Sequence, residues 1–112
     1  MRHYAPRARL ILVDAPVEEL GTRLKEAAMG LSKERVGVML PAGVDASLGL
    51  ADCSIFPWGQ WSALEELAQR LYAGLRTLDQ EGCTAILCPV PPAEGIGAAI
   101  RDRLRKAAKT GT

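Results

Sequence analysis

The sequence predicts an α/β fold in which a mostly parallel sheet of about four or five strands is covered by helices on both faces. Short runs of branched apolar residues, typical of strands buried on both sides, alternate with longer segments whose apolar residues recur every three or four positions. These longer segments have room for crossover helices, which favours parallel pairing. With 112 residues, 48% hydrophobic and 24% charged, the chain has the size and composition of one globular domain.

The first half of the chain is expected to form a strand, a helix and a second strand. Arg9–Asp14 is a short apolar run that a turn former closes, which predicts a buried strand. Asp14 is then a candidate N-cap for a helix that ends at Gly30. Arg35–Leu40 predicts the second buried strand, followed by a loop over residues 42–49. The apolar positions of the helix are Val17, Leu20, Leu24, Ala27, Ala28 and Leu31.

The middle of the chain predicts a short strand and the longest helix. Cys53–Phe56 has a weaker strand pattern, and we expect a loop with a packed aromatic residue over Pro57–Gly59. Ser62 and Glu65 have the spacing of a capping box, which marks a helix start, and Gly82 marks its end. Its apolar stripe consists of Leu64, Leu67, Ala68, Leu71, Tyr72, Leu75 and Leu78.

The last part of the chain predicts one more strand and one more helix. Cys83–Cys88 is an apolar strand with a proline-rich exit, and a helix begins around Glu94–Gly97. We expect Ile96, Ala99, Ile100, Leu104 and Ala107 on its apolar face. We expect Arg101, Arg105, Lys106 and Lys109 toward solvent or the helix end. Together the elements predict a Rossmann-like three-layer α/β/α sandwich, with 3-2-1-4 as the preferred strand order.

The charge and the cysteine content argue against several classes of protein. A net charge of +1 gives no field that would indicate a nucleic-acid or membrane partner. The uncharged stretches are too short for a signal segment or a membrane helix. The three cysteines form neither an even disulfide framework nor a CxxC pair, so we interpret them as small buried hydrophobic residues in a reducing compartment. We therefore expect a cytoplasmic protein without a membrane partner.

The chain offers few groups for catalysis. Its one histidine, His3, precedes the first strand, and no spacing typical of a metal site or a hydrolase appears, so we assign no catalytic residue and no metal ligand. Gly95, Ile96 and Gly97 lead into a helix whose free amides could bind an anion such as a nucleotide phosphate. Close packing of the helix on the sheet explains the two glycines equally simply, and we favour it.

Two further groups of residues could serve recognition. The basic residues of the last helix could contact RNA phosphates, although solvated side chains at a helix end are the preferred interpretation. Trp58 and Trp61 could anchor a partner surface or cover the domain's own core, and the sequence leaves both open. The basic residues meant here are Arg101, Arg103, Arg105, Lys106 and Lys109.

Three blocks of the sequence resemble the C-terminal part of two-domain threonylcarbamoyl-adenylate synthases of the Sua-five type. His3–Pro6 (HYAP), followed by a basic residue and a strand, is similar to the segment that links the two domains of this family. Leu71–Asp79 (LYAGLRTLD) and Glu94–Ala108 (EGIGAAIRDRLRKAA) resemble its C-terminal helices. The blocks span nearly the whole chain. The resemblance implies a linker over residues 1–7 and an accessory domain over residues 8–109, and we expect a frayed tail over residues 110–112 after the last helix.

The resemblance also implies the activity of a complete protein. Such an enzyme uses ATP, with Mg, together with L-threonine and bicarbonate to make threonylcarbamoyl-AMP and pyrophosphate, the first step of the t6A modification of tRNA. Its chemistry lies in a YrdC-type catalytic domain, to which nothing in this sequence corresponds. The implied partners are that domain in cis and proteins of the tRNA pathway, and the chain itself needs no cofactor. His3, Tyr4 and Pro6 are the linker positions that would visit the active site of the catalytic domain.

Three functional hypotheses therefore compete. The preferred one is an accessory, regulatory domain that positions the linker over the cleft of the YrdC-type domain, without being an enzyme itself. The first alternative is a free-standing module that binds ATP or GTP through Gly95–Gly97. The second is an RNA-contacting module that uses the basic last helix.

Overall fold

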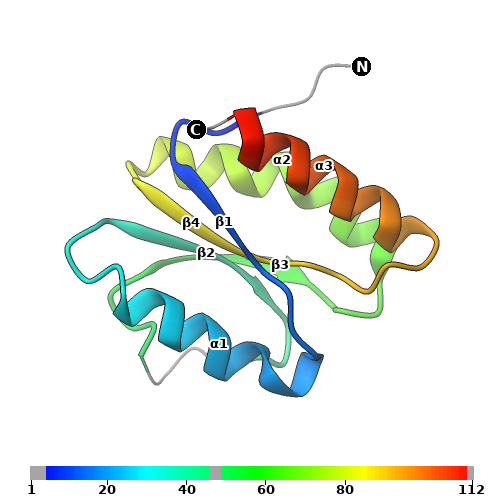
Figure 1. Ribbon diagram of the computed structural model, residues 1–112, viewed down its shortest axis with the longest axis horizontal. Helices are drawn as coiled ribbons and strands as arrows, with labels where there is room; N and C mark the ends of the chain where they lie inside the picture. Colours follow the sequence, from blue (N-terminus) through cyan, green and yellow to red (C-terminus); the bar gives the residue numbers. More distant parts are fainter. Residues whose placement is uncertain (1–4, 46–48, 111–112) are drawn as a thin grey trace.

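The computed structural model describes residues 5–45 and 49–110 of the chain. In this part, the helices and strands form three layers, with α1 on one face of a central sheet and α2 and α3 on the other (Figure 1). This confirms the predicted Rossmann-like α/β/α sandwich. The elements, in chain order, are β1 (Arg9–Val13), α1 (Val17–Met29), β2 (Val36–Pro41), β3 (Ser54–Gly59), α2 (Leu64–Gln80), β4 (Ala85–Pro89) and α3 (Ile96–Thr110).

The four strands of the described sheet are all parallel, in the order β1-β4-β2-β3. The expected order 3-2-1-4, which placed β1 next to β2, is wrong, because β4 lies between these two strands. All five residues of β4 are buried, as suits a central strand, whereas β1 has an exposed Arg9 and half-buried Ile11 and Leu12, as suits an edge. The sequences of β1 and β4 are both short apolar runs, so the apolar pattern alone did not show which strand is central and which lies at the edge.

The core lies on both faces of the sheet. Between the sheet and α1 are Leu20, Leu24 and Val38, and between the sheet and the other two helices are Met39, Leu71 and Ile100, all without solvent exposure. The apolar stripes predicted for α1 and α2 are therefore the faces that these two helices bury, which is the usual source of stability for helices of this length. Val17 is an exception, because it is 48% exposed at the first position of α1.

Neither predicted side-chain cap forms. The N-cap position of α1 is Pro16 and that of α2 is Ala63, and neither helix start has a side-chain capping bond. Asp14 instead forms an ion pair with Arg101 of α3. Because α2 begins at Leu64, one residue later than the capping box requires, Ser62 stands outside the N-cap position.

Strand β3 is longer than expected and includes Pro57–Gly59, which we predicted as a loop. Proline is tolerated here because β3 is an edge strand, where an amide donor is not needed on the open side. The packed aromatic residue was predicted correctly: Trp58 has no exposed surface, and its Nε1–H donates to the carbonyl of Leu67 at 2.9 Å. Arg70 donates to the carbonyls of Pro57 and Trp58 and so satisfies acceptors of this edge strand.

Helix α3 is rotated relative to our expectation. Ile96 and Ala99 are exposed, and the buried face is made by Gly97, Ile100, Leu104 and Ala107. Gly97 takes the place expected for Ile96 because its missing side chain lets the helix start approach the backbone of Pro92. The helix reaches Thr110, so it includes the first residue of the expected frayed tail, whose last two residues lie outside the described part.

Candidate functional site: the base of the N-terminal segment

The described N-terminal segment is packed onto the domain at the amino ends of the strands. Pro6 and Ala8 are buried, Ala8 being 2% exposed, and the alternating Ala5 and Arg7 are exposed. His3 and Tyr4, which the sequence suggested as contacts of a catalytic cleft, lie outside the described residues. Pro6, the third of these positions, is thus buried in this domain, and its predicted contact with a catalytic cleft stays a prediction.

Asp79, in the last turn of α2, holds this segment. Its two carboxylate oxygens accept hydrogen bonds from the backbone N–H groups of Arg7, at 2.8 Å, and of Ala8, at 3.0 Å. Hydrogen bonds to a charged acceptor are shorter and stronger than neutral ones, and the amide of Ala8 is partly shielded from water. The last turn of a helix more than seventy positions away along the chain therefore fixes the base of the segment.

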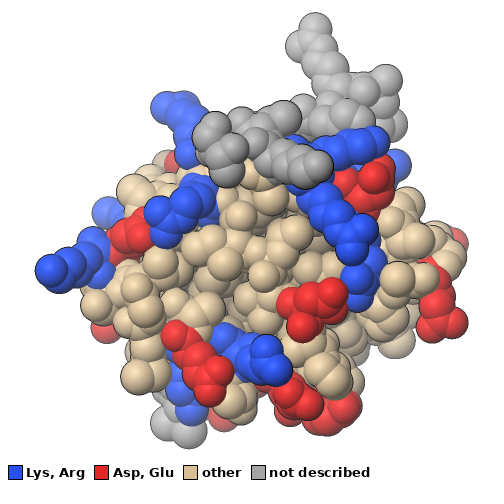
Figure 2. All heavy atoms as spheres, viewed as in Figure 1, with Lys and Arg blue, Asp and Glu red and all other residues tan. Residues whose placement is uncertain are grey.

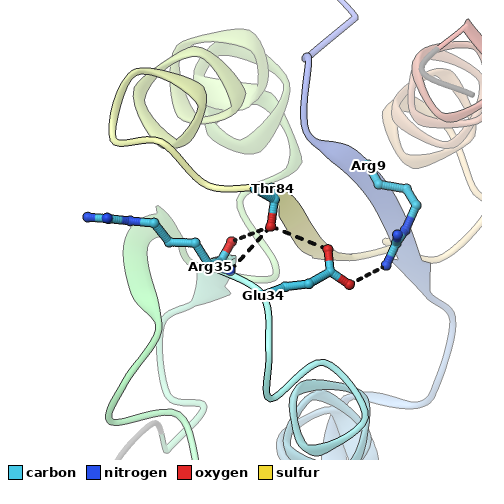
Figure 3. Close-up of polar contacts among 4 residues, drawn as sticks. All are labelled: Arg9, Glu34, Arg35 and Thr84. Atoms are coloured by element: carbon cyan, nitrogen blue, oxygen red, sulfur yellow. Dashed lines mark hydrogen bonds and ion pairs between the residues drawn. The ribbon is translucent and has the colours of Figure 1, made fainter.

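A second group of polar contacts joins the same end of the sheet (Figure 3). Arg9 of β1 forms an ion pair with Glu34 at 2.8 Å, and the hydroxyl of Thr84, just before β4, donates to the other carboxylate oxygen at 3.3 Å. Arg35 takes part through its backbone, which donates to the Thr84 hydroxyl, while its side chain points away. Because Arg9 is 53% exposed, this ion pair is screened and supports the start of the strands only modestly.

The Gly95–Gly97 segment is used by the fold itself. The amide of Gly97 donates to Glu94 and that of Ala98 to Gly95, so two N–H groups at the helix start already have partners. A Cβ at Gly97 would overlap the carbonyl oxygen of Pro92. These contacts agree with the packing interpretation that the sequence favoured. Nucleotide binding at Gly95, Ile96 and Gly97 stays a prediction.

A cavity of about 430 Å³ lies at the opposite, carboxyl end of the sheet. Strands β1 and β4 are neighbours, but β1 leads to α1 on one face and β4 to α3 on the other, which is the arrangement that creates a crevice in open α/β sheets. Asp14, Trp61 and Arg101 lie in its wall. Arg101 is already engaged, since its guanidinium binds both oxygens of Asp14, at 2.9 and 3.1 Å, and the carbonyl of Pro91 at 2.6 Å.

The basic residues of α3 are less available than the sequence suggested. Arg101 is only 16% exposed and is held by Asp14, which corrects the expectation that it faces solvent. Lys106 forms an ion pair with Asp102 one turn earlier, and the side chain of Lys109 lies outside the described part. On the face shown in Figure 2, side chains of both signs are spread around a centre that is largely uncharged. The basic side chains on this face thus lie next to acidic ones (Figure 2), which weakens the case for RNA contact.

Two of the three cysteines are buried, as the sequence predicted, and the third is only half-buried. Cys83 and Cys88 are buried and Cys53 is half-buried, all three as free thiols. Burial raises the pKa of each thiol, most strongly for Cys88, so none is a thiolate nucleophile near neutral pH. Among the described residues, no three His, Cys, Asp or Glu side chains are grouped to hold a metal ion. No helix in this part of the chain is long and apolar enough to cross a membrane.

The described fold defines an open parallel α/β domain whose N-terminal segment is fastened to its helical layer. The family model described as the C-terminal domain of threonylcarbamoyl-AMP synthase matches residues 1–109. The chain belongs to this family, which confirms the resemblance seen in the HYAP, LRxLD and GIG blocks. The family match begins with the N-terminal segment itself and is not confined to the packed domain.

Curated relatives agree with this assignment. The threonylcarbamoyl-AMP synthase of Pyrococcus abyssi is 33% identical over 108 residues, which make up 95% of this chain and 29% of the relative. The enzyme of the same name from Bacillus subtilis is 34% identical over 109 residues, or 95% of this chain and 30% of the relative. The chain thus spans less than a third of the length of these relatives.

Solved structures give the same result. The Sua5 protein of P. abyssi, crystallised in complex with L-threonine, matches with a TM-score of 0.81 and 30% identity, over 99% of this chain and 31% of that one. The C-terminal Sua5 domain of Pyrococcus horikoshii matches with a TM-score of 0.70 and 28% identity, over 90% of this chain and 93% of that one. The second match shows the same fold in a protein of nearly the same extent.

Two contacts near these sites escaped the sequence analysis. Asp79 was part of a recognised block without an assigned role, and Asp14 was assigned to the wrong partner. An acidic residue in the last turn of a helix is unfavourable for the helix dipole, and this was the available signal for Asp79. No local pattern could have paired Asp14 with Arg101, because 87 positions separate them along the chain.

Proposed function

We propose that this chain is the accessory domain of a threonylcarbamoyl-AMP synthase and that it positions its N-terminal segment over the catalytic cleft of a YrdC-type domain. In this proposal the partner domain uses ATP, with Mg, L-threonine and bicarbonate to make threonylcarbamoyl-AMP for the t6A modification of tRNA. This chain supplies no reacting group. It contributes by placing His3 and Tyr4 and by excluding water from the cleft.

The observation that carries the proposal is the family match over residues 1–109, because it includes the HYAP segment as well as the packed domain. The curated relatives are about three times longer than this chain, which leaves room for a catalytic domain in a parent protein. The described contacts are compatible with the proposal, since the base of the segment is held at Arg7 and Ala8 while the residues before it come from the family linker.

Tyr4→Ala in the two-domain protein tests the proposal. A tyrosine ring covers apolar area and its hydroxyl gives a polar contact, so its loss should lower the rate of threonylcarbamoyl-AMP formation about tenfold or more. The melting temperature should change by less than about 2 °C, because a residue before the first strand supports little core. Both quantities are measured on the same preparations.

Two further samples sharpen this experiment. Tyr4→Phe keeps the ring and should retain most of the rate if apolar cover is the main contribution. The chain alone should release no pyrophosphate above a blank without protein, because in this proposal the cations that serve adenylyl transfer belong to the YrdC-type domain. Unchanged turnover in Tyr4→Ala, or threonine-dependent turnover by the chain alone, would contradict the proposal.

A further inference from the structure

We propose that Asp79 is a positioning residue of the synthase, which fixes the direction in which the N-terminal segment leaves the domain. The inference rests on the proposed function, because direction matters only if the segment has a cleft to reach. It adds a specific residue and mechanism: the carboxylate at the end of α2 sets the path of residues 5–8, and this path places His3 and Tyr4. Asp79 touches no substrate in this scheme and acts through the backbone that it holds.

The two hydrogen bonds to Asp79 impose a bend. In an extended chain, successive amides point to opposite sides, so Arg7 and Ala8 could not both donate to one carboxylate. The backbone does bend at these two residues, and both N–H groups reach Asp79, at 2.8 and 3.0 Å. The carboxylate therefore selects a bent path over a straight continuation of β1.

Ala8 within the bend and the residues next to it hold the bend in place. Ala8 is 2% exposed within the core between the sheet and the helices α2 and α3, and Pro6 is also buried. Immediately after the bend, the amide of Arg9 donates to the carbonyl of Thr84 at 2.9 Å and begins the pairing of β1 with β4. The segment thus starts from a point that the sheet and α2 define together, which reduces the conformations open to the residues before it.

Asp79 is poorly suited to its own helix. It lies in the last turn of α2, where the negative end of the helix dipole disfavours a carboxylate and favours a basic residue. This turn contains no basic residue, and Glu81 at the C-cap adds a second acidic group. Positions that break a local rule while making specific distant contacts are often functional. The distant contact here is with the segment, which supports a role for Asp79 beyond the stability of α2.

Asp79→Asn in the two-domain protein is the main test. An amide side chain keeps one acceptor oxygen but turns its NH₂ group toward the second backbone donor, so the paired acceptance is lost. Deuterium uptake in the peptide covering residues 5–10 should increase, and kcat should fall about tenfold. KM for ATP should stay within about twofold, because Asp79 does not contact the nucleotide in this scheme. If the asparagine variant does not fold, Asp79→Glu, which keeps the charge but displaces it, is measured by the same criteria.

Asp14→Asn is the matched control. It makes the same chemical change in a carboxylate that also accepts two hydrogen bonds, but at the carboxyl end of the sheet. It should leave kcat and the exchange of residues 5–10 unchanged. An equal fall of kcat in this control would show a general effect of destabilisation and would overturn the role of Asp79.

A double variant separates positioning from stability. If Asp79 acts through Tyr4, adding Asp79→Asn to Tyr4→Ala should lower kcat no further, because residues that act as one unit are not additive. If the two substitutions lower kcat independently, so that their effects multiply in the double variant, the inference is overturned. Unchanged deuterium uptake of residues 5–10 in Asp79→Asn would also overturn it. Raised exchange with unchanged kcat, while Tyr4→Ala still lowers kcat, would also overturn it and leave the proposed function standing. Unchanged kcat in Tyr4→Ala would overturn the proposed function itself.

Discussion

Trp58 and Trp61 are neighbouring tryptophans that have different environments and different roles. Their rings lie 5.8 Å apart in an edge-to-face arrangement, yet Trp58 has no exposed surface and Trp61 is half-buried in the wall of the carboxyl-end cavity. The sequence left open whether such residues cover the core or anchor a partner. Trp58 covers the core, because the strand places it facing α2, where its Nε1–H finds the carbonyl of Leu67.

Trp58→Phe should destabilise the domain by about 2–3 kcal/mol. The change leaves space in a closed part of the core and removes a buried hydrogen bond donor. Urea unfolding followed by circular dichroism measures the effect. Trp61→Phe is the control, and we expect a loss of about 1 kcal/mol or less because that ring is partly solvated. A larger loss in Trp61→Phe than in Trp58→Phe would contradict this assignment.

The partners of polar side chains were the hardest feature to predict. Asp14 and Ser62 both have the residue type and local position of helix caps, and neither caps, because a bond across the molecule or a shifted helix start replaces the local one. Asp79 shows the same competition, since its partners are the amides of Arg7 and Ala8. A local sequence pattern indicates which hydrogen bonds a side chain can form within its own turn. It carries no information on partners that are distant in the sequence and that folding brings close.

At the scale of elements, the apolar periodicity predicted the helices and the stronger strands, but it did not predict the order of the strands in the sheet. All three helices and the three stronger strands appear where the apolar patterns predict them, because the spacing of apolar residues follows the geometry of the buried face. Strand order depends instead on which strand the third crossover reaches, and β1 and β4 are both short apolar runs. The clearest difference between them is the exposed Arg9, one side chain among ten.

The contact between α3 and the loop before it depends on Gly97. A Cβ there would overlap the carbonyl oxygen of Pro92, and a backbone group cannot move aside as a flexible side chain can. Gly97→Ala should therefore cost about 2 kcal/mol in the free energy of unfolding, although alanine favours the helix itself.

Gly30→Ala serves as the control for this prediction. Gly30 ends α1 with an ordinary φ of −72°, and a Cβ there would meet the carbonyl of Ala27 at an acceptable 3.6 Å. Its effect should lie within about 0.5 kcal/mol, and denaturant unfolding measures both variants. If Gly97→Ala is also neutral, close packing does not explain the glycine, and the anion-binding hypothesis for Gly95–Gly97 gains weight.

For the whole molecule, the two ends of the sheet have separate features. At the amino end Asp79 holds the N-terminal segment and Arg9 pairs with Glu34, whereas the carboxyl end has the cavity bounded by Asp14 and Arg101. Open α/β sheets usually bind ligands at the carboxyl end, so that end was the natural place to look for a site. The family segment joins at the other end, as its place directly before β1 requires, and what the sequence could not reveal is that Asp79 of α2 holds it there.

The buried thiols should make the stability of the whole domain depend on alkaline pH. Burial raises the pKa of Cys88 far above its usual range, so this thiol stays protonated in the folded state. The unfolded chain loses the proton above about pH 8.5 and then binds fewer protons than the folded state, so stability falls as pH rises. Cys88 alone should contribute a slope of about 1.4 kcal/mol per pH unit in this range. Urea unfolding from about pH 7 to about pH 10 measures the slope. The plot of unfolding free energy against pH should be flatter for Cys88→Ala by that amount, because the other ionisable groups are common to both proteins. Parallel plots for the two proteins would show that the Cys88 thiol is not held in its neutral form.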